Sequence, residues 1–236
     1  MLSFQFVMLI SIIELINGEL NNCNEIEFES SNLTVASTLN GKIQGQCETV
    51  TLIYSNNSKI NSHIFSWKSI PYAEPAINDL RFARSLPVKD WTEIKMSTQY
   101  PNICTQLDVE GNIVGSEDCL YLNVYVRSDV YLNRNISLSP ILVFIHGGDF
   151  NSGSSVVYDQ SIIAAMSSII VITIQYRLNV FGFLRLEGTI ATGNQGLFDQ
   201  NLALKWVYDN ARFFGGDQTK ITINGQGAGA NSVFLI

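Results

Sequence analysis

The sequence is poor in charge, above all in positive charge. Only 15% of its 236 residues are charged, against roughly a quarter in an average soluble domain. With 14 basic and 21 acidic residues, the net charge of −7 argues against nucleic acid or an anionic membrane surface as a partner. The apolar share of 46% excludes intrinsic disorder and a collagen-like repeat, so the chain is predicted to be globular.

Long apolar runs are also absent, except at the N-terminus. Residues Phe4 to Ile16 are mostly apolar, are too few to span a bilayer, and precede the small residue Gly18. This pattern predicts a signal peptide at residues 1–18 and a secreted product without a transmembrane segment, with a buried N-terminal helix as the alternative.

The cysteines do not have the spacing of a metal-binding motif, so no metal and no other cofactor is expected. In an exported chain, cysteines are expected to form disulfides. Four of them allow three pairings, which the residues alone leave open: Cys23, Cys47, Cys104 and Cys119.

Three sequons lie in polar stretches rich in Asn and Ser, at Asn32, Asn56 and Asn135. They predict N-glycosylation on surface loops. A chain with many asparagines also produces sequons by chance, which is the alternative.

The first half of the chain has the pattern of a small β region. From Asn32 to Trp67, short alternating runs are separated by turn residues, and Asn40-Gly41 predicts a hairpin. Ser69 to Trp91 has the composition of a surface loop. Leu120 to Val126 alternates in polarity, which predicts a half-buried strand.

The second half has the pattern of an α/β protein. Ile141 to Ile145 and Ile169 to Ile174 are β-branched apolar runs, typical of parallel strands buried on both faces. The other expected elements are a crossover helix within Ser155 to Ser168, a helix over Asn194 to Phe214 that stops at Gly215-Gly216, and a strand at Ile221 to Ile223. This order predicts one domain with a mostly parallel central sheet flanked by helices.

The turn after the last expected strand carries a chemical signal. Gly225-Gln226-Gly227-Ala228-Gly229 stands where a G-x-S-x-G nucleophile elbow would lie between a strand and a helix, but its central residue is Gly227. Upstream, His146-Gly147-Gly148-Asp149 follows the strand that ends at Ile145. This segment is similar to a loop whose backbone N–H groups form an oxyanion hole.

These two motifs, with other blocks in the same order, resemble the carboxylesterase type B family, which includes cholinesterases, carboxylesterases and the non-catalytic neuroligins and glutactins. The resemblance runs from about residue 34 to the end and implies the α/β-hydrolase fold. The further blocks are Ile70 to Pro75, Leu80 to Phe82, Glu117 to Tyr125, Gln175 to Leu178, Gly193 to Gln200 and Phe214 to Asp217.

The resemblance implies an inactive elbow, as in the neuroligin and glutactin groups. In catalytic members a central serine attacks an ester carbonyl, a histidine takes its proton, and an acidic residue orients the histidine. Gly227 has no side chain for the attack, and the two histidines are His63 in the β region and His146 in the oxyanion-like loop. No catalytic residue is therefore assigned, and the remaining site elements are three oxyanion-hole-like donors: Gly147, Gly148 and Ala228.

Four residues near these motifs bear on the same point. Asp149 replaces a glycine of the family's loop, where its carboxylate would oppose developing negative charge unless it points into solvent. Gln226 replaces the glutamate that is common before the catalytic serine, which also points to inactivity unless the glutamine keeps the buried hydrogen bonds of that glutamate. Ser154 and Ser232 have no base at any motif spacing and are not expected to replace the nucleophile.

Family position also implies a disulfide and a boundary. It pairs Cys104 with Cys119, which leaves Cys23 and Cys47 as the other pair. Residues 19–236 would form a carboxylesterase type B domain that is truncated after the elbow, so only the N-terminal portion of the fold is expected. An open sheet edge then predicts an insoluble or molten product for this segment alone.

Three functions remain open at this point. The leading hypothesis is a secreted, catalytically inactive carboxylesterase- or cholinesterase-like protein that binds an unidentified extracellular protein or serves adhesion. One alternative is a serine carboxylic-ester hydrolase that this sequence records in part. The other is a truncated product without function.

Overall fold

The computed structural model describes residues 20–22, 34–54 and 58–236. The predicted signal peptide, Cys23, Asn32 and Asn56 lie outside these residues, so the expectations for them stay predictions.

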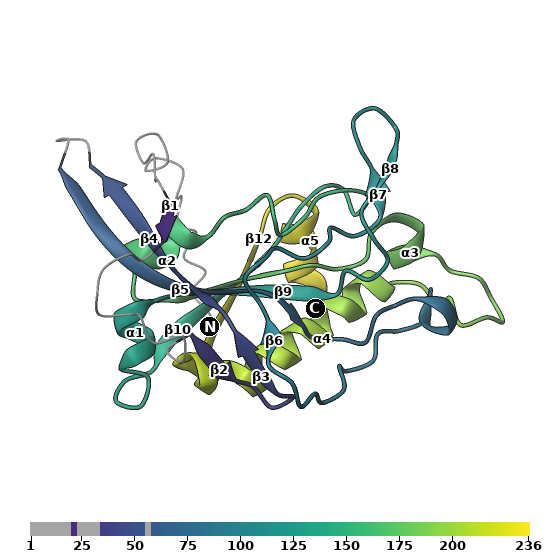
Figure 1. Cartoon of the computed structure of the whole chain (residues 1–236). Coiled ribbons are helices and arrows are strands. Elements are labelled where there is room, and N and C mark those ends of the chain that lie inside the picture. The colour runs from purple at the N-terminus through teal and green to yellow at the C-terminus, as the bar shows by residue number, and fades with distance from the viewer. Residues whose placement is uncertain (1–19, 23–33, 55–57) are drawn as a thin grey trace, which may run out of the picture.

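A seven-stranded sheet in the order β1-β4-β5-β9-β11-β10-β12 runs through the molecule (Figure 1). Its strands are β1 (Leu20–Asn22), β4 (Gln46–Ile53), β5 (Lys59–Pro71), β9 (Tyr121–Arg127), β10 (Ser139–Ile145), β11 (Ile170–Ile174) and β12 (Gly216–Gly225). The α/β class is confirmed. In place of a mostly parallel sheet, however, the described strands of this seven-stranded sheet are parallel only between β11, β10 and β12. The other pairings are antiparallel, and β4 and β5 are joined as a hairpin, which needs no helical crossover.

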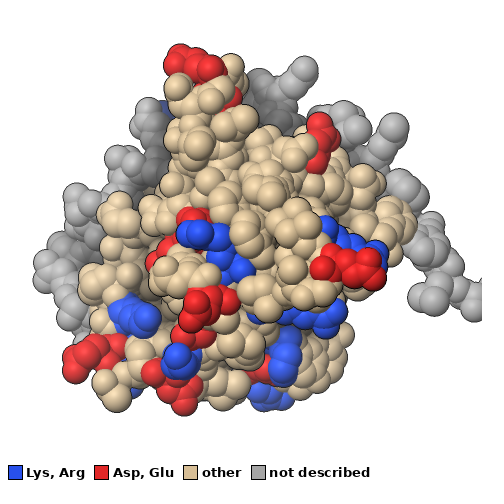
Figure 2. Space-filling view, turned by 90° about the vertical axis from the view of Figure 1, so that its right-hand side faces the viewer, with Lys and Arg blue, Asp and Glu red and all other residues tan. Residues whose placement is uncertain are grey.

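Two small sheets accompany the main one. They contain β2 (Val35–Ser37), β3 (Lys42–Gln44) and β6 (Lys95–Met96) in one, and β7 (Gln106–Leu107) and β8 (Ile113–Val114) in the other. β2 and β3 form the hairpin that Asn40-Gly41 predicted. The β7–β8 hairpin projects from the body of the molecule (Figure 1) and carries the half-buried Asp108 and the exposed Glu110. On the face shown in Figure 2, acidic and basic side chains are otherwise interspersed.

The helical elements are α1 (Ser128–Leu132), α2 (Ser161–Met166), α3 (Asn179–Phe183), α4 (Gln195–Asn210), α5 (Ala228–Leu235) and the 3₁₀ turns η2 (Asn78–Leu80) and η3 (Ala211–Phe214). α4 and η3 together confirm the long helix expected from the sequence. It ends at Gly215, whose φ of 87° is a left-handed conformation that favours glycine. The crossover helix is also present, as the six-residue α2.

Helices cover both faces of the sheet. Because successive side chains of a strand point to opposite faces, Ile172 of β11 packs with Trp206 and Val207 on the α4 side, whereas Val171 packs with Ala164 on the α2 side. The two packed faces form the hydrophobic core on either side of β9 and β11.

Burial differs from expectation in two strands. The interior residues of β9 are all buried, so this strand is covered on both faces and not half-buried. β10 shows the opposite difference, because Leu142 and Phe144 are only partly buried. The polarity of a strand alone did not reveal which neighbours cover it.

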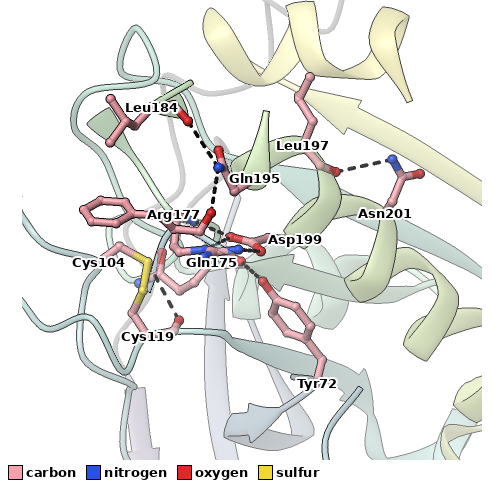
Figure 3. A network of polar contacts seen from close by, with 11 residues as sticks. Tyr72, Cys104, Cys119, Gln175, Arg177, Leu184, Gln195, Leu197, Asp199 and Asn201 are labelled. Atoms are coloured by element: carbon pink, nitrogen blue, oxygen red, sulfur yellow. Dashed lines mark hydrogen bonds and ion pairs between the residues drawn. A yellow bond between two sulfur atoms is a disulfide. The ribbon is translucent and has the colours of Figure 1, made fainter. Parts of the chain in front are cut away.

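A buried ion pair joins the end of β11 to α4 (Figure 3). Nε and Nη2 of Arg177 donate to the carboxylate oxygens of Asp199 at 2.8 and 2.7 Å, and the backbone N–H of Arg177 donates to the same group at 3.1 Å. The exposed fractions of the two side chains are 3% and 0%. Nearby, Tyr72 donates to the carbonyl of Gln175 at 2.7 Å, and Gln195 donates to the carbonyls of Phe82 and Leu184. Together these contacts fix the segment after β11.

We expect Asp199→Asn to lower the free energy of unfolding by roughly 3–5 kcal/mol, because it leaves the Arg177 guanidinium buried without its counter-charge. The control is Asp209→Asn, which breaks the exposed pair with Lys205 and should cost less than about 0.5 kcal/mol. Urea unfolding of both variants measures the difference. Equal, small losses would show that the buried pair does not hold α4 to the sheet.

Candidate functional site

The turn between β12 and α5 has the geometry of a nucleophile elbow. β12 ends at Gly225 and α5 begins at Ala228, so two residues make the turn. Gly227 has φ 55° and ψ −120°, a conformation that strains any residue with a side chain. A Cβ atom built on Gly227 would meet no heavy atom within 4 Å. Position 227 therefore lies at an open tip, but no side chain is there to act.

The other glycines of this turn meet a different constraint, because they lie against backbone. A Cβ atom on Gly229 would overlap the carbonyl oxygen of Ile145, and one on Gly225 would overlap the backbone of Gly229. Glycine at these two positions lets α5 approach the end of β10 closely. Gly225 and Gly229 are therefore required for packing, whereas glycine is favoured at position 227 because of its positive φ.

The glycine loop after β10 lies beside this turn. β10 and β12 are parallel, with Ile145 opposite Gly225, so both segments leave the sheet at the same edge. A Cβ atom on Gly147 would overlap the carbonyl oxygen of Gln226 and lie 3.7 Å from the nitrogen of Ala228. The structure thus brings Gly147 and Ala228, two of the three predicted donors, together.

The predicted donors also have free N–H groups. In the part of the chain that the structure describes, the N–H groups of Gly147, Gly148 and Ala228 donate to no protein acceptor. Unpaired N–H groups at one edge can stabilise an oxyanion. The assignment of these groups as an oxyanion hole stays a prediction.

His146 supports this loop from inside. Its ring is buried and stacks on Tyr176 at 4.4 Å between centroids, and Tyr176 donates to the carbonyl of His146 at 2.8 Å. Nδ1 lies 2.9 Å from the carbonyl oxygen of Gly147. Burial lowers the pKa of His146 to about 4, although the hydrogen bond to Gly147 acts in the opposite direction. The imidazole is therefore neutral at neutral pH and is enclosed by the loop.

His63 lies far from the elbow. It is on β5, and β9, β11 and β10 separate β5 from β12. At about 4.8 Å per strand, this places the two strands roughly 19 Å apart. Nδ1 of His63 lies 3.0 Å from the hydroxyl of Thr49 on the neighbouring strand. His63 cannot take a proton from a group at position 227.

The two serines considered as substitutes are buried. The Ser154 hydroxyl accepts hydrogen bonds from the N–H of Val156 at 2.9 Å and from Nε2 of Gln175 at 3.1 Å. Ser232 has no exposed surface, and its hydroxyl contacts no polar atom of the described residues. Neither serine has a base beside it.

Solvent exposure bears on the two alternatives left open for Asp149 and for Gln226. Asp149 is exposed and adopts a φ of 56°. Gln226 is also exposed, and its Oε1 accepts a hydrogen bond from the hydroxyl of Tyr158 at 2.8 Å. The expectation that Gln226 keeps buried hydrogen bonds is therefore wrong for the described structure, because both this residue and its hydrogen bond to Tyr158 are exposed.

Tyr158 is a site residue that the sequence did not reveal. Its ring lies 4.7 Å from that of Phe144, and its hydroxyl reaches Gln226, 68 residues further along the chain. It lies in an irregular segment before α2 that has no periodic pattern. Only the folded chain brings it to the elbow.

The disulfide between Cys104 and Cys119 is confirmed, with a Cα–Cα distance of 5.0 Å. Cys47 is also in a disulfide, and its expected pairing with Cys23 involves a residue outside the described ones.

Asn135 is exposed in the turn after α1, as a glycan acceptor must be. Within the described ranges, no group of acidic, His or Cys side chains is arranged for a metal, and no helix is long and apolar enough to cross a membrane.

A strand, strained turn and helix beside a glycine loop, at the carboxyl edge of parallel strands, define an α/β-hydrolase. The model of the carboxylesterase family matches residues 32–236. The chain is 36% identical over 213 residues to carboxylesterase 1D of Rattus norvegicus, covering 84% of this chain and 36% of that protein. It is 34% identical over 216 residues to liver carboxylesterase 1 of Oryctolagus cuniculus, covering 86% and 36% respectively. The chain belongs to the carboxylesterase family and spans about a third of the length of these relatives.

Alanine substitutions should separate the two glycine constraints at the elbow. Gly227→Ala adds a side chain in open space and should cost only the strain of its φ, about 1–2 kcal/mol of unfolding free energy. Gly229→Ala should cost more than about 3 kcal/mol, because its Cβ atom displaces α5 from the end of β10. Denaturant unfolding compares the two. A loss at position 227 as large as at 229 would contradict the open tip.

His146 should make stability depend on pH. Its pKa is about 4 in the folded chain against 6.5 as the ordinary value, so the unfolded chain binds more protons between these pH values. The contribution is complete above pH 6.5 and is lost as the pH falls toward 4, with a slope of at most about 1.4 kcal/mol per pH unit. His146→Asn keeps a donor for Gly147 and should flatten this slope in unfolding measured from pH 7 to 4.5. An unchanged slope in the variant would assign the pH dependence to other groups.

Proposed function

We propose that this carboxylesterase-family chain is a secreted, non-hydrolytic protein with an extracellular binding role. The observation that carries the proposal is Gly227. It occupies the open tip of an otherwise well-formed elbow, and it offers no atom that can attack a carbonyl.

Among the described residues, no base lies within reach of position 227. Nucleophilic catalysis needs a base within hydrogen-bond reach of the nucleophile. His146 is enclosed below the loop, and His63 lies four strand spacings away. Ser154 and Ser232 are buried and lack a base.

The scaffold around the elbow is nevertheless well kept. The ion pair between Arg177 and Asp199 is buried and bidentate, and the glycine packing of α5 on β10 is tight. Such a scaffold can present loops to a partner without performing chemistry. This combination favours binding to an extracellular protein over hydrolysis.

Three features support secretion. The apolar leader at residues 1–18 has the pattern of a signal peptide. The disulfide between Cys104 and Cys119 belongs to an oxidising compartment, and the sequon at Asn135 is exposed.

Ester hydrolysis by a serine mechanism is the second candidate, and one observation favours it. Gly147 lies beside Ala228, and among the described residues the N–H groups of both donate to no protein acceptor, which is the kind of donor pair that a tetrahedral intermediate needs. This arrangement would stabilise the oxyanion of the intermediate, but it does not provide a nucleophile.

A fluorophosphonate probe, which labels activated serines, distinguishes the candidates. The protein expressed from its natural gene should be recovered from the culture medium and should form no covalent adduct, while a serine carboxylesterase treated in parallel is labelled. An adduct that an ester substrate competes away would contradict the proposal, and retention inside the cells would contradict secretion.

The Gly227→Ser variant completes this experiment. It places a hydroxyl at the open tip without a steric clash. Labelling of the variant alone would assign the inactivity to position 227. Absence of labelling in both proteins would show that a base is missing as well.

A further inference from the structure

A hollow lies on the surface between the turn after α1 and η3, away from the elbow. Five residues line it and enclose about 440 Å³: Arg134, Asn135, Ile136, Leu138 and Arg212. The two segments are held together, because the N–H of Ser139 donates to the carbonyl of Gly215 at 2.8 Å. A Cβ atom on Gly215 would lie 2.9 Å from that of Arg134, so the close approach favours glycine there. The backbone thus fixes how closely the two segments that flank the hollow approach each other.

Within the part of the chain that the structure describes, neither arginine of the hollow has an ion-pair partner. All 14 basic residues are described, and seven of them pair with carboxylates. Arg134 and Arg212 are not among these seven, and no acidic side chain lines the hollow. In a chain of net charge −7, two unneutralised guanidinium groups at one hollow reverse the overall charge locally.

Arg134 is held in one orientation. Its Nη1 donates to the carbonyl of Tyr131 at 2.8 Å, and its guanidinium lies 4.0 Å from the centre of the Tyr131 ring. These contacts use one edge of the guanidinium and leave the other N–H groups for a ligand. A fixed guanidinium loses less side-chain entropy on binding than a mobile one.

The chemistry of the hollow selects its ligand. A planar guanidinium matches the paired oxygens of a carboxylate or sulfate group. Ile136, which is 85% exposed, and Leu138 add an apolar surface suited to the C–H face of a sugar ring. We propose that this hollow binds an anionic sugar bearing a carboxylate or sulfate group.

The sugar has two possible sources. Asn135 is itself the acceptor of a sequon with Ser137, so a glycan attached there would begin at the rim of the hollow. A free extracellular glycan is the other source. The proposal concerns the chemistry that both share, and it does not depend on whether the elbow hydrolyses esters.

Titration calorimetry with a sulfated, uronic-acid-containing disaccharide tests the site on the full secreted chain. Arg212→Gln removes a charge that has no partner in the fold and should weaken binding about tenfold or more. Arg185→Gln is the matched control, because Arg185 is also exposed and makes no ion pair with a described residue. It lies in the segment after α3, at the opposite end of the molecule from α1 (Figure 1). Its affinity should stay within about twofold, since only a distant charge is lost.

Ser137→Ala removes the sequon without changing a lining residue and identifies the source. Binding of the disaccharide only after this change would show that the chain's own glycan fills the hollow, and equal binding before and after it would point to a free glycan. Either result supports the proposal if Arg212→Gln weakens binding in the same background. Equal weakening by Arg212→Gln and Arg185→Gln, or no binding at millimolar disaccharide in either background, would overturn it.

Discussion

The close approach of α5 to the end of β10 is the constraint on which the candidate site depends. Gly229 lies against the carbonyl oxygen of Ile145, and Gly147 lies against that of Gln226. Side chains at these positions would push apart the helix and the loop that flank the elbow. The juxtaposition of Gly147 with Ala228 is therefore a consequence of backbone packing, and it persists whatever residue stands at the tip.

Because backbone packing fixes the elbow independently of the side chain at position 227, the elbow can form without a nucleophile. The fold requires a left-handed conformation at position 227, and glycine adopts that conformation without the strain that a serine would bear. The chemistry of a serine hydrolase requires a hydroxyl there, but a side chain would contribute nothing to the packing, because a Cβ atom at position 227 would meet no heavy atom within 4 Å. Loss of the side chain is thus compatible with the geometry of the turn.

The sequence allowed prediction of those parts that depend on local pattern or on ordered motifs. The β-branched run of β11, the helical spacing of α4 with its stop at Gly215, and the glycine blocks of the elbow and loop carry their signal within a few residues. The burial of β9 and β10 was less predictable, because it depends on which helices cover each strand. Two features join segments that are distant in the sequence, and no local pattern predicts them. They are the hydrogen bond between Tyr158 and Gln226, and the hollow that Arg134 and Arg212 line together.

The distribution of charge links the site to the proposed binding role. Among the described residues, the buried Asp, Glu, Lys and Arg side chains form two pairs, Arg177 with Asp199 and Glu48 with Lys68, the latter at 2.8 Å. Burial raises the pKa of Glu48, but hydrogen bonds from Lys68, Ser66 and Gln46 outweigh it, and the pKa is lowered. A carboxylate held ionised by such donors is a structural group, whereas an acid or base in catalysis must exchange its proton near the operating pH. The buried charges of this chain therefore stabilise the scaffold, and what it offers to other molecules is backbone N–H groups at the elbow and unpaired guanidinium groups at the surface. Both are means of binding a negatively charged or carbonyl oxygen, and neither by itself breaks a bond.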